Sequence, residues 1–192
     1  MTIITTTKEM RPRDPNDHYP TPIPTVEAAL ALLPPTFRPV DILDPGAGDG
    51  VWGRVACRRW RSAELHGVEL RDVEQNGAYD LWYKNTDFRL LNRSCQYDLV
   101  IGNPPYKHAE EFVRLSLQCL DADGYLLFLL RLAFLEGQER GRDLWRRLPP
   151  KAVHVCSARP SFTQDKRTDA TAYGVFCWQK GWQGETQLGW VA

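Results

Sequence analysis

Strand-length apolar runs alternate with helix-like segments through most of the chain, and few folds accommodate such an order. We expect strands at Val40–Leu43, Leu65–Leu70, Tyr97–Ile101, Tyr125–Leu130, Ala152–Cys156 and Ala172–Gln179. We expect helices at Val26–Leu33, capped by Thr25, and at Val51–Trp60, 72–83, Ala109–Leu120 and Gly137–Arg147, with a turn at 121–124. Tyr125–Leu130 is continuously apolar, as a strand covered on both faces must be. The order predicts an α/β domain with a mainly parallel sheet.

The length of 192 residues suits one domain. We expect residues 1–18 to form a flexible arm and residues 19–192 to form a single folded domain. The 24 basic and 24 acidic residues cancel, so composition does not indicate a protein that binds nucleic acid through bulk charge. Arginine outnumbers lysine, however, and arginine is the better partner for phosphates and bases.

Composition also bears on compartment. The longest apolar stretch, Tyr125–Leu135, is interrupted by Arg131 and is far shorter than the roughly 20 residues of a membrane span. Residues 1–13 are polar and do not resemble a signal peptide. The five cysteines are scattered and never in C-x-x-C spacing, which argues against a zinc site or a disulfide framework. We therefore expect reduced thiols, a cytoplasmic location and no metal.

A glycine-rich turn, residues 44–50, follows the first expected strand and precedes a helix. Such a turn presents backbone N–H groups to a ligand, and Gly46, Gly48 and Gly50 let it approach closely. The G-x-G-x-x-G spacing of a dinucleotide site is missing. Asp44 at the strand end suits a cationic group, such as an amino group, better than a pyrophosphate.

Two further strand ends carry acidic residues. Glu69 ends the second expected strand, 25 residues after Asp44, and a carboxylate there can accept both hydroxyls of a ribose. Asp87 can accept from an adenine amino group, and Phe88 can form an apolar wall for its ring. Glu69 taken alone is a weak signal that its spacing from Asp44 strengthens, and Asp87 taken alone is about equally compatible with a surface turn.

The most informative segment is Asn103-Pro104-Pro105-Tyr106, which directly follows the expected buried strand Tyr97–Ile101 and Gly102. Open α/β sheets bind ligands at the carboxyl ends of their strands. Two consecutive prolines donate no N–H and fix φ, so the Asn103 side chain and the Pro104 carbonyl are held as acceptors. Tyr106 places an aromatic ring beside them. This arrangement is suited to holding an NH₂ group.

With these motifs, the chain resembles the S-adenosylmethionine-dependent N6-adenine DNA methyltransferases, particularly the small phage-type members, from Tyr19 to about Trp178. Tyr19-Pro-Thr-Pro22 is similar to the segment that precedes the glycine turn in one branch of that family. Arg159-Pro-Ser-Phe162 resembles the later motif whose aromatic residue packs on an extruded base. Residues 168–178 resemble the closing antiparallel strand.

The resemblance implies a Rossmann-like methyltransferase fold, with a mostly parallel seven-stranded sheet, an antiparallel last strand and helices on both faces. It implies S-adenosylmethionine as the cofactor and adenine N6 in DNA as the acceptor. The implied cofactor-binding residues are Tyr19, Thr21, Pro22, Asp44, Pro45, Gly46, Ala47, Gly48, Glu69, Leu70, Asp87, Phe88 and Asn103. The implied catalytic residues are Asn103, Pro104, Pro105 and Tyr106, and the implied substrate-binding residues are Tyr106 and Phe162. We also expect Lys166 and Arg167, in the loop Gln164–Thr168, to contact substrate phosphates.

One feature departs from this family branch: about a dozen residues follow Lys180, where a target-recognition domain normally lies. We therefore expect a catalytic domain without a separate recognition domain, and either relaxed sequence specificity or a homodimer or partner subunit that reads the target. Phosphate contacts are also possible at Arg58, Arg59 and Arg61 and at Arg140–Arg147. For both arginine clusters, a solvated helix face is the favoured interpretation.

Alternatives remain open at this point. The same fold and motif also fit a methyltransferase that acts on RNA or on a glutamine amide. A different class, a module that binds S-adenosylmethionine or nucleic acid without turnover, is disfavoured by the intact Asn103-Pro-Pro-Tyr106. A nicotinamide-dependent enzyme is disfavoured by the glycine spacing.

Overall fold

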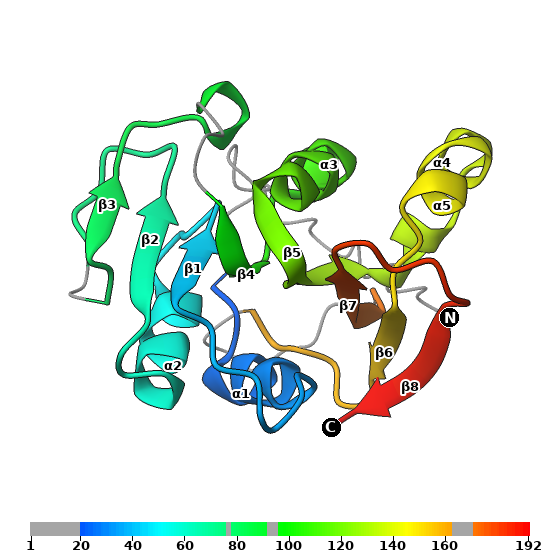
Figure 1. The fold of residues 1–192 in the computed structure, drawn as a ribbon, viewed down its shortest axis with the longest axis horizontal. Helices are drawn as coiled ribbons and strands as arrows, with labels where there is room; N and C mark the ends of the chain where they lie inside the picture. The colour runs from blue at the N-terminus through cyan, green and yellow to red at the C-terminus, as the bar shows by residue number, and fades with distance from the viewer. Residues whose placement is uncertain (1–19, 76–77, 92–95, 163–170) are drawn as a thin grey trace, which may run out of the picture.

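An eight-stranded sheet forms the centre of the computed structural model, which describes residues 20–75, 78–91, 96–162 and 171–192 (Figure 1). The strand order is β3-β2-β1-β4-β5-β7-β6-β8. The strands are β1 (Asp41–Asp44), β2 (Glu64–Val68), β3 (Leu81–Tyr83), β4 (Tyr97–Gly102), β5 (Leu120–Arg131), β6 (Ala152–Cys156), β7 (Tyr173–Gln179) and β8 (Gln187–Val191). The α/β class and the mainly parallel sheet are confirmed.

The strands pair in the expected topology, but the sheet has eight strands where seven were expected. Strands β3, β2, β1, β4 and β5 run parallel, and β7 lies antiparallel between β5 and β6. The prediction of an antiparallel closing strand near residues 172–179 is therefore confirmed. The eighth strand, β8, was not predicted; it pairs in parallel with β6 at the edge of the sheet. Leu188 and Trp190 on β8 remain exposed, so its sequence lacks the pattern of a buried strand.

Helices cover both faces of the sheet: α1 (Ile23–Ala31), α2 (Val51–Arg59), α3 (Ala109–Cys119), α4 (Gln138–Arg142) and α5 (Leu144–Arg147), with 3₁₀ turns η1 (Phe88–Leu90), η2 (Tyr106–His108) and η3 (Leu132–Leu135). Two apolar clusters reflect the alternation of side chains along a strand. On β4, Leu99 and Ile101 pack with α1 and α2, whereas Val100 packs with α3 and α5. Within the described part of the chain, no helix combines the length and apolarity needed to cross a membrane.

Two expectations for the first half of the chain were wrong. Helix α1 begins at Ile23, directly after Pro22, and Thr25 does not cap it; Pro24 suits a first helical turn, where its missing N–H is not needed. The described residues between 72 and 83 contain no helix. Instead, the Gln75 side chain exchanges two hydrogen bonds with the Tyr79 backbone, and a short strand, β3, follows.

Two further boundaries differ in the second half. The helix predicted at Gly137–Arg147 is divided into α4 and α5 at Asp143, whose φ of −118° and ψ of −68° lie outside regular helical values. The turn expected at 121–124 belongs to β5, where the register with β4 shifts between Tyr97 and Leu99. Asp123 has a positive φ of 64°, which is typical of a turn residue. The residues expected to form a turn therefore make the first part of β5 irregular.

Candidate active site

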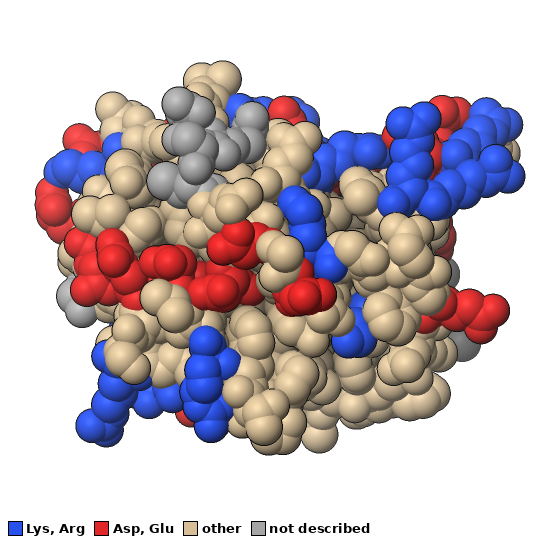
Figure 2. All heavy atoms as spheres, viewed as in Figure 1, with Lys and Arg blue, Asp and Glu red and all other residues tan. Residues whose placement is uncertain are grey.

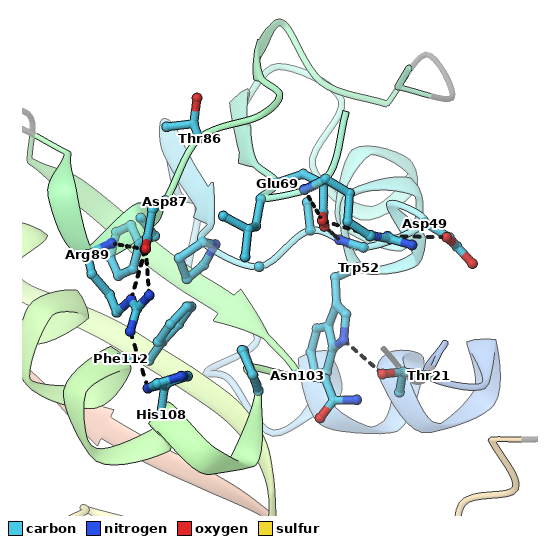
Figure 3. Close-up of a pocket in the computed structure, with 18 of the residues that line it drawn as sticks. Thr21, Asp49, Trp52, Glu69, Thr86, Asp87, Arg89, Asn103, His108 and Phe112 are labelled. Carbon is cyan, nitrogen blue, oxygen red and sulfur yellow. Dashed lines mark hydrogen bonds and ion pairs between the residues drawn. The ribbon is translucent and has the colours of Figure 1, made fainter. Parts of the chain in front are cut away.

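A cleft lies at the carboxyl edge of the parallel strands, between the loops that follow β1, β2, β3 and β4 (Figure 3). It encloses about 1090 Å³ of space, part of which is open to solvent. Its lining comes from residues 20–21, 45–49, 51–52, 69–71, 86–89, 103, 105, 107–108 and from Phe112. The structure therefore gathers most of the glycine turn, the acids Glu69 and Asp87, and Asn103 and Pro105 of the Asn-Pro-Pro-Tyr segment around one cavity.

The glycine turn joins β1 to α2 and needs glycine at two positions. Gly48 and Gly50 have φ of 58° and 70°, a left-handed conformation that costs other residues roughly 1–2 kcal/mol. The Ala47 N–H donates to the Val68 carbonyl at 2.9 Å, which fixes the turn to β2. Gly46 faces two lining residues, Pro105 and Phe112, and a Cβ there would make contact with Phe112 at 3.6 Å. A side chain at Gly46 would therefore fit the fold but occupy part of the cleft.

Glu69 directly follows β2 and fixes the floor of the cleft. Its Oε2 accepts from the Gly48 N–H at 2.7 Å, and its Oε1 accepts from the N–H and Nε of Arg71 at 2.9 and 2.8 Å. Carboxylate oxygens have further lone pairs, so this carboxylate can still accept from ligand hydroxyls. The exposed Leu70 lies beside it in the lining.

Asp87 and Phe88 lie on the opposite wall. Arg89 donates Nε to Asp87 Oδ1 at 2.9 Å and Nη2 to Oδ2 at 2.6 Å, and this pairing lowers the pKa of Asp87. Arg89 also lies 3.3 Å from His108 Nδ1, so a charged network reaches the loop after β4. Phe88 is buried and packs against Phe112, with ring centroids 5.3 Å apart.

Asp44 occupies the end of β1 but is not among the side chains that line the cleft. The Tyr79 hydroxyl donates to its Oδ2 at 2.8 Å, whereas its Oδ1 is buried without a partner among the described residues. Burial raises the pKa of Asp44 to about 7, and the charge of Glu69 adds to the shift. Gly102 leaves room for this carboxylate, since a Cβ there would lie 3.1 Å from Oδ1.

Asn103-Pro104-Pro105-Tyr106 forms the corner between the cleft and a second group of side chains. Asn103 and Pro105 line the cleft, Pro104 is buried, and Tyr106 begins η2. The Arg131 guanidinium lies over the Tyr106 ring, 4.4 Å from its centroid, and Tyr173 lies 5.9 Å away. Burial raises the pKa of the Tyr106 hydroxyl.

The predicted substrate residue Phe162 joins this second group through Tyr173, with ring centroids 5.0 Å apart. Phe162 and Tyr106 thus flank the same ring at the start of β7. Arg131 and Tyr173, which hold register positions opposite each other on β5 and β7, were not predicted as site residues. No local sequence motif marks them, because their place depends on the pairing of those strands.

The N-terminal segment closes one side of the cleft. Thr21 is buried and accepts from the Trp52 Nε1 at 3.2 Å, which ties this segment to α2, and Pro22 immediately precedes α1. Tyr19, Lys166 and Arg167, three of the predicted site residues, lie outside the described residues, as does the arm expected at 1–18. Ten lining residues were not predicted as site residues, among them Trp52, Arg71, Arg89 and His108. In the described ranges, no group of three or more His, Cys, Asp or Glu side chains is placed to hold a metal ion.

Comparisons with known proteins agree on the fold. No family model matches the chain. A release factor glutamine methyltransferase from Koribacter versatilis is 25% identical over 150 residues, which cover 73% of this chain and 48% of the relative. The chain therefore spans about half the length of this curated relative.

Two solved structures have similar architectures. A putative class I S-adenosylmethionine-dependent methyltransferase from Listeria monocytogenes gives a TM-score of 0.68 at 14% identity, covering 91% of this chain and 66% of that one. The methyltransferase subunit of a type I restriction-modification system from Streptococcus thermophilus gives 0.66 at 17% identity, covering 86% and 46%. The chain has the Rossmann-like fold of class I methyltransferases, and S-adenosylmethionine is the cofactor that this fold implies.

Proposed function

We propose that this chain transfers a methyl group from S-adenosylmethionine to the N6 amino group of adenine in DNA. The observation that carries the proposal is the position of the Asn103-Pro-Pro-Tyr106 corner. Asn103 and Pro105 line the cleft, while Tyr106 belongs to the aromatic group beside it. An amino group held at this corner lies between a cofactor site and an acceptor site.

The cleft fits the proposed cofactor in its shape and donor set. The turn containing Gly46 and Gly48 leaves a backbone-lined cradle, and the carboxylate of Glu69 is held in place to accept ribose hydroxyls. Asp87 and Phe88 provide an acceptor and an apolar surface for an adenine ring. We assign the amino group of the methionine part to the cleft beside the end of β1, where Pro45 and Gly46 form the lining in front of the buried Asp44. Thr21 and Pro22, with Tyr19, would border the same part.

The corner residues supply positioning and fixed dipoles. S-adenosylmethionine, when bound, supplies an electrophilic methyl group on a positively charged sulfur. The lone pair of an aromatic amine is delocalised into its ring, so the amine is a poor nucleophile. The Asn103 Oδ1 and the Pro104 carbonyl can accept its two hydrogens and draw the nitrogen towards tetrahedral geometry. The proton becomes acidic only as the new bond forms, so no strong base is needed at the start.

The side of the corner away from the cofactor supports a nucleobase as the acceptor. Tyr106, Tyr173 and Phe162 place three aromatic rings in sequence there. An adenine must leave the duplex to reach this corner, at a cost of a few kcal/mol. Stacking on aromatic side chains offsets that cost by roughly 1–3 kcal/mol per base. The type I restriction-modification subunit of similar fold is consistent with a DNA acceptor.

A second candidate acceptor is a glutamine amide, and one observation favours it. The curated relative that matches 73% of the chain is named a release factor glutamine methyltransferase. A glutamine amide also presents a planar NH₂ group with a delocalised lone pair, so the same two acceptors could hold it. The corner by itself is therefore compatible with either substrate.

Mass spectrometry after incubation with methyl-labelled S-adenosylmethionine separates these possibilities. Parallel reactions would contain duplex DNA, RNA, or a release factor protein that carries an accessible glutamine. We expect label in N6-methyl-2′-deoxyadenosine from DNA and little in the other two. Label in glutamine alone would replace the proposal with the second candidate, and label in none would refute both. A Gln118→Ala variant, altered on the exposed surface of α3, controls for preparation effects.

A further inference from the structure

Charge is distributed unequally between the two edges of the sheet. Five neighbouring strands carry an acidic residue within two positions of their amino ends: Asp80, Glu64, Asp41, Asp98 and Asp121, in spatial order from β3 to β5. Figure 2 shows a band of Asp and Glu side chains across these strands. Burial raises the pKa of Asp41, and the neighbouring charges of Glu64 and Asp98 contribute. This edge, opposite the cleft, repels polyanions.

Positive charge gathers instead on α4 and α5, which stand at a corner of the molecule (Figures 1 and 2). Arg142, Arg146 and Arg147 are exposed there. We refer to these three side chains as the α4–α5 arginines. Exposed fractions of 70% and 77% for the side chains of Arg142 and Arg147 leave both guanidinium groups accessible.

The other residues of these short helices hold them against the body. Leu144 is fully buried, and Trp145 packs edge-on against Phe134 at 5.4 Å. Arg140 is turned inward, donating to the Phe134 carbonyl at 2.9 Å. Arg114 on α3 pairs with Asp143 at 2.6 Å. The inner side of α4–α5 is thus anchored to the core, which fixes the arginines on its outer side.

The ion pairs of the α4–α5 arginines are of the weak, exposed kind. Arg142 lies 3.2 Å from Glu139, whose side chain is 89% exposed, and Arg147 lies 2.8 Å from Asp143, which Arg114 also contacts. Exposed pairs of this type contribute little because water and salt screen them. A phosphate, with its two-pronged geometry and full charge, competes well for such guanidinium groups.

Along the chain, the segment that carries this surface directly follows the proposed acceptor side. Strand β5 ends at Arg131, which covers the Tyr106 ring, and α4 begins seven residues further along the chain. We propose that the α4–α5 arginines bind the phosphate backbone of the acceptor DNA beside the extruded base. This inference rests on the proposed DNA substrate. It also replaces our initial interpretation of Arg140–Arg147 as a merely solvated helix face.

The chain contains a matched control for a test. Arg58, Arg59 and Arg61 are also exposed and also lie within six residues of one another, but they end α2 and precede β2. They therefore lie at the acidic edge of the sheet. The triple variants R142Q/R146Q/R147Q and R58Q/R59Q/R61Q remove the same charge from helices on opposite faces of the sheet.

The measurement is fluorescence anisotropy of a labelled 20-base-pair duplex with the full chain, from about 50 to 300 mM salt. Each lost phosphate contact lowers the slope of log affinity against log salt concentration by about 0.9. The α4–α5 variant should therefore lose roughly 2–3 in this slope. Its affinity near 100 mM salt should fall at least about tenfold. The α2 variant should stay within about twofold of the wild type. If the triple α4–α5 variant does not fold, Arg146→Gln alone should lower the slope by about 0.9.

The proposal that the α4–α5 arginines bind DNA would be rejected by any of three results. These are equal losses of affinity in both triple variants, no loss in either, or no duplex binding by the wild type. The failure of the proposed function looks different. The wild type would then form no N6-methyladenine, although duplex affinity still fell only in the α4–α5 variant. Conversely, adenine methylation with unchanged duplex affinity in the α4–α5 variant would retain the function and reject the surface.

Discussion

The two sides of the Asn103-Pro-Pro-Tyr106 corner are built differently. On the cleft side, backbone turns and carboxylates are already joined by hydrogen bonds, as in the contacts of Glu69 with Gly48 and Arg71. On the other side, the Tyr106 ring lies between the Arg131 guanidinium and the Tyr173 ring, and its hydroxyl is also hydrogen-bonded to Tyr173 and Asn103. Hydrogen bonds fix a ligand with defined donors and acceptors, whereas ring faces accept many planar groups. The first side therefore suits one constant cofactor, and the second decides which acceptor is used.

The largest effect should come from the corner itself, which the two sides share. Removing one fixed dipole from a transition state typically slows catalysis about 100- to 1000-fold. We expect Asn103→Ala to lower the single-turnover rate of methyl transfer by that amount while duplex affinity changes little. Rapid-quench kinetics at saturating cofactor and DNA would measure it. A rate within about fivefold of the wild type would show that the corner does not hold the amine.

A change on the cleft side should affect the cofactor alone. Glu69→Gln removes the charge that accepts from Gly48 and Arg71, and hydrogen bonds to charged groups contribute about 1.5–3 kcal/mol. We expect cofactor affinity, measured by calorimetry, to fall about 10- to 160-fold. Glu139→Gln, at a side chain 89% exposed, should leave it unchanged. A matching loss of duplex affinity in the Glu69 variant would contradict the separation of the two sides.

Behind the cleft side, Asp44 should make the stability of the ligand-free protein depend on pH. Its pKa in the folded protein, about 7, lies above the ordinary value of 3.8, so the native state holds the proton more tightly than the unfolded state. This stabilisation is complete below about pH 4 and is lost as the pH rises through 7. Urea unfolding should show that the wild type loses about 2 kcal/mol more than Asp44→Asn between pH 5 and 8. If the free energy of unfolding changed with pH in the same way in both proteins, the raised pKa of the buried Asp44 carboxyl would be refuted.

The smallest effects are expected on the acceptor side, where ring contacts are individually weak. Tyr106→Ala and Phe162→Ala should each raise the KM for DNA about tenfold, with cofactor affinity unchanged, since base stacking contributes roughly 1–3 kcal/mol. Steady-state kinetics with varied DNA would test this. Trp190→Ala, at an exposed aromatic side chain on β8, is the control. If either variant lowered cofactor affinity as much as it raised the KM for DNA, the separation of a cofactor side from an acceptor side would be contradicted.

Much of the architecture could be predicted from the sequence, because apolar periodicity reports burial directly. The strands β1, β2, β4, β5, β6 and β7 all fall within a few residues of the expected runs. The segment 72–83 could not be predicted in this way. Its backbone bonds are made by the Gln75 side chain and by pairing with β2, and neither leaves a local periodic signal.

Some residues of the candidate site could likewise be predicted from the sequence, and others could not. Residues that follow strand ends, such as Asp44, Glu69 and Asn103, could be placed at one edge because parallel strands end together. The pairing of Asp87 with Arg89, and the position of Arg131 over Tyr106, could not be predicted. The first depends on the local 3₁₀ turn η1, which has no periodic signal, and the second on the register of β5 with β7.

The central claim is geometric, and a crystal structure would test it most directly. The complex would contain the protein, S-adenosylhomocysteine and a short DNA with an adenine that can leave the stack. We predict that the adenine N6 lies within about 3.2 Å of both the Asn103 Oδ1 and the Pro104 carbonyl oxygen, with its ring against Tyr106. An adenine bound elsewhere, or a cofactor product bound outside the cleft between Glu69 and Asn103, would contradict the account.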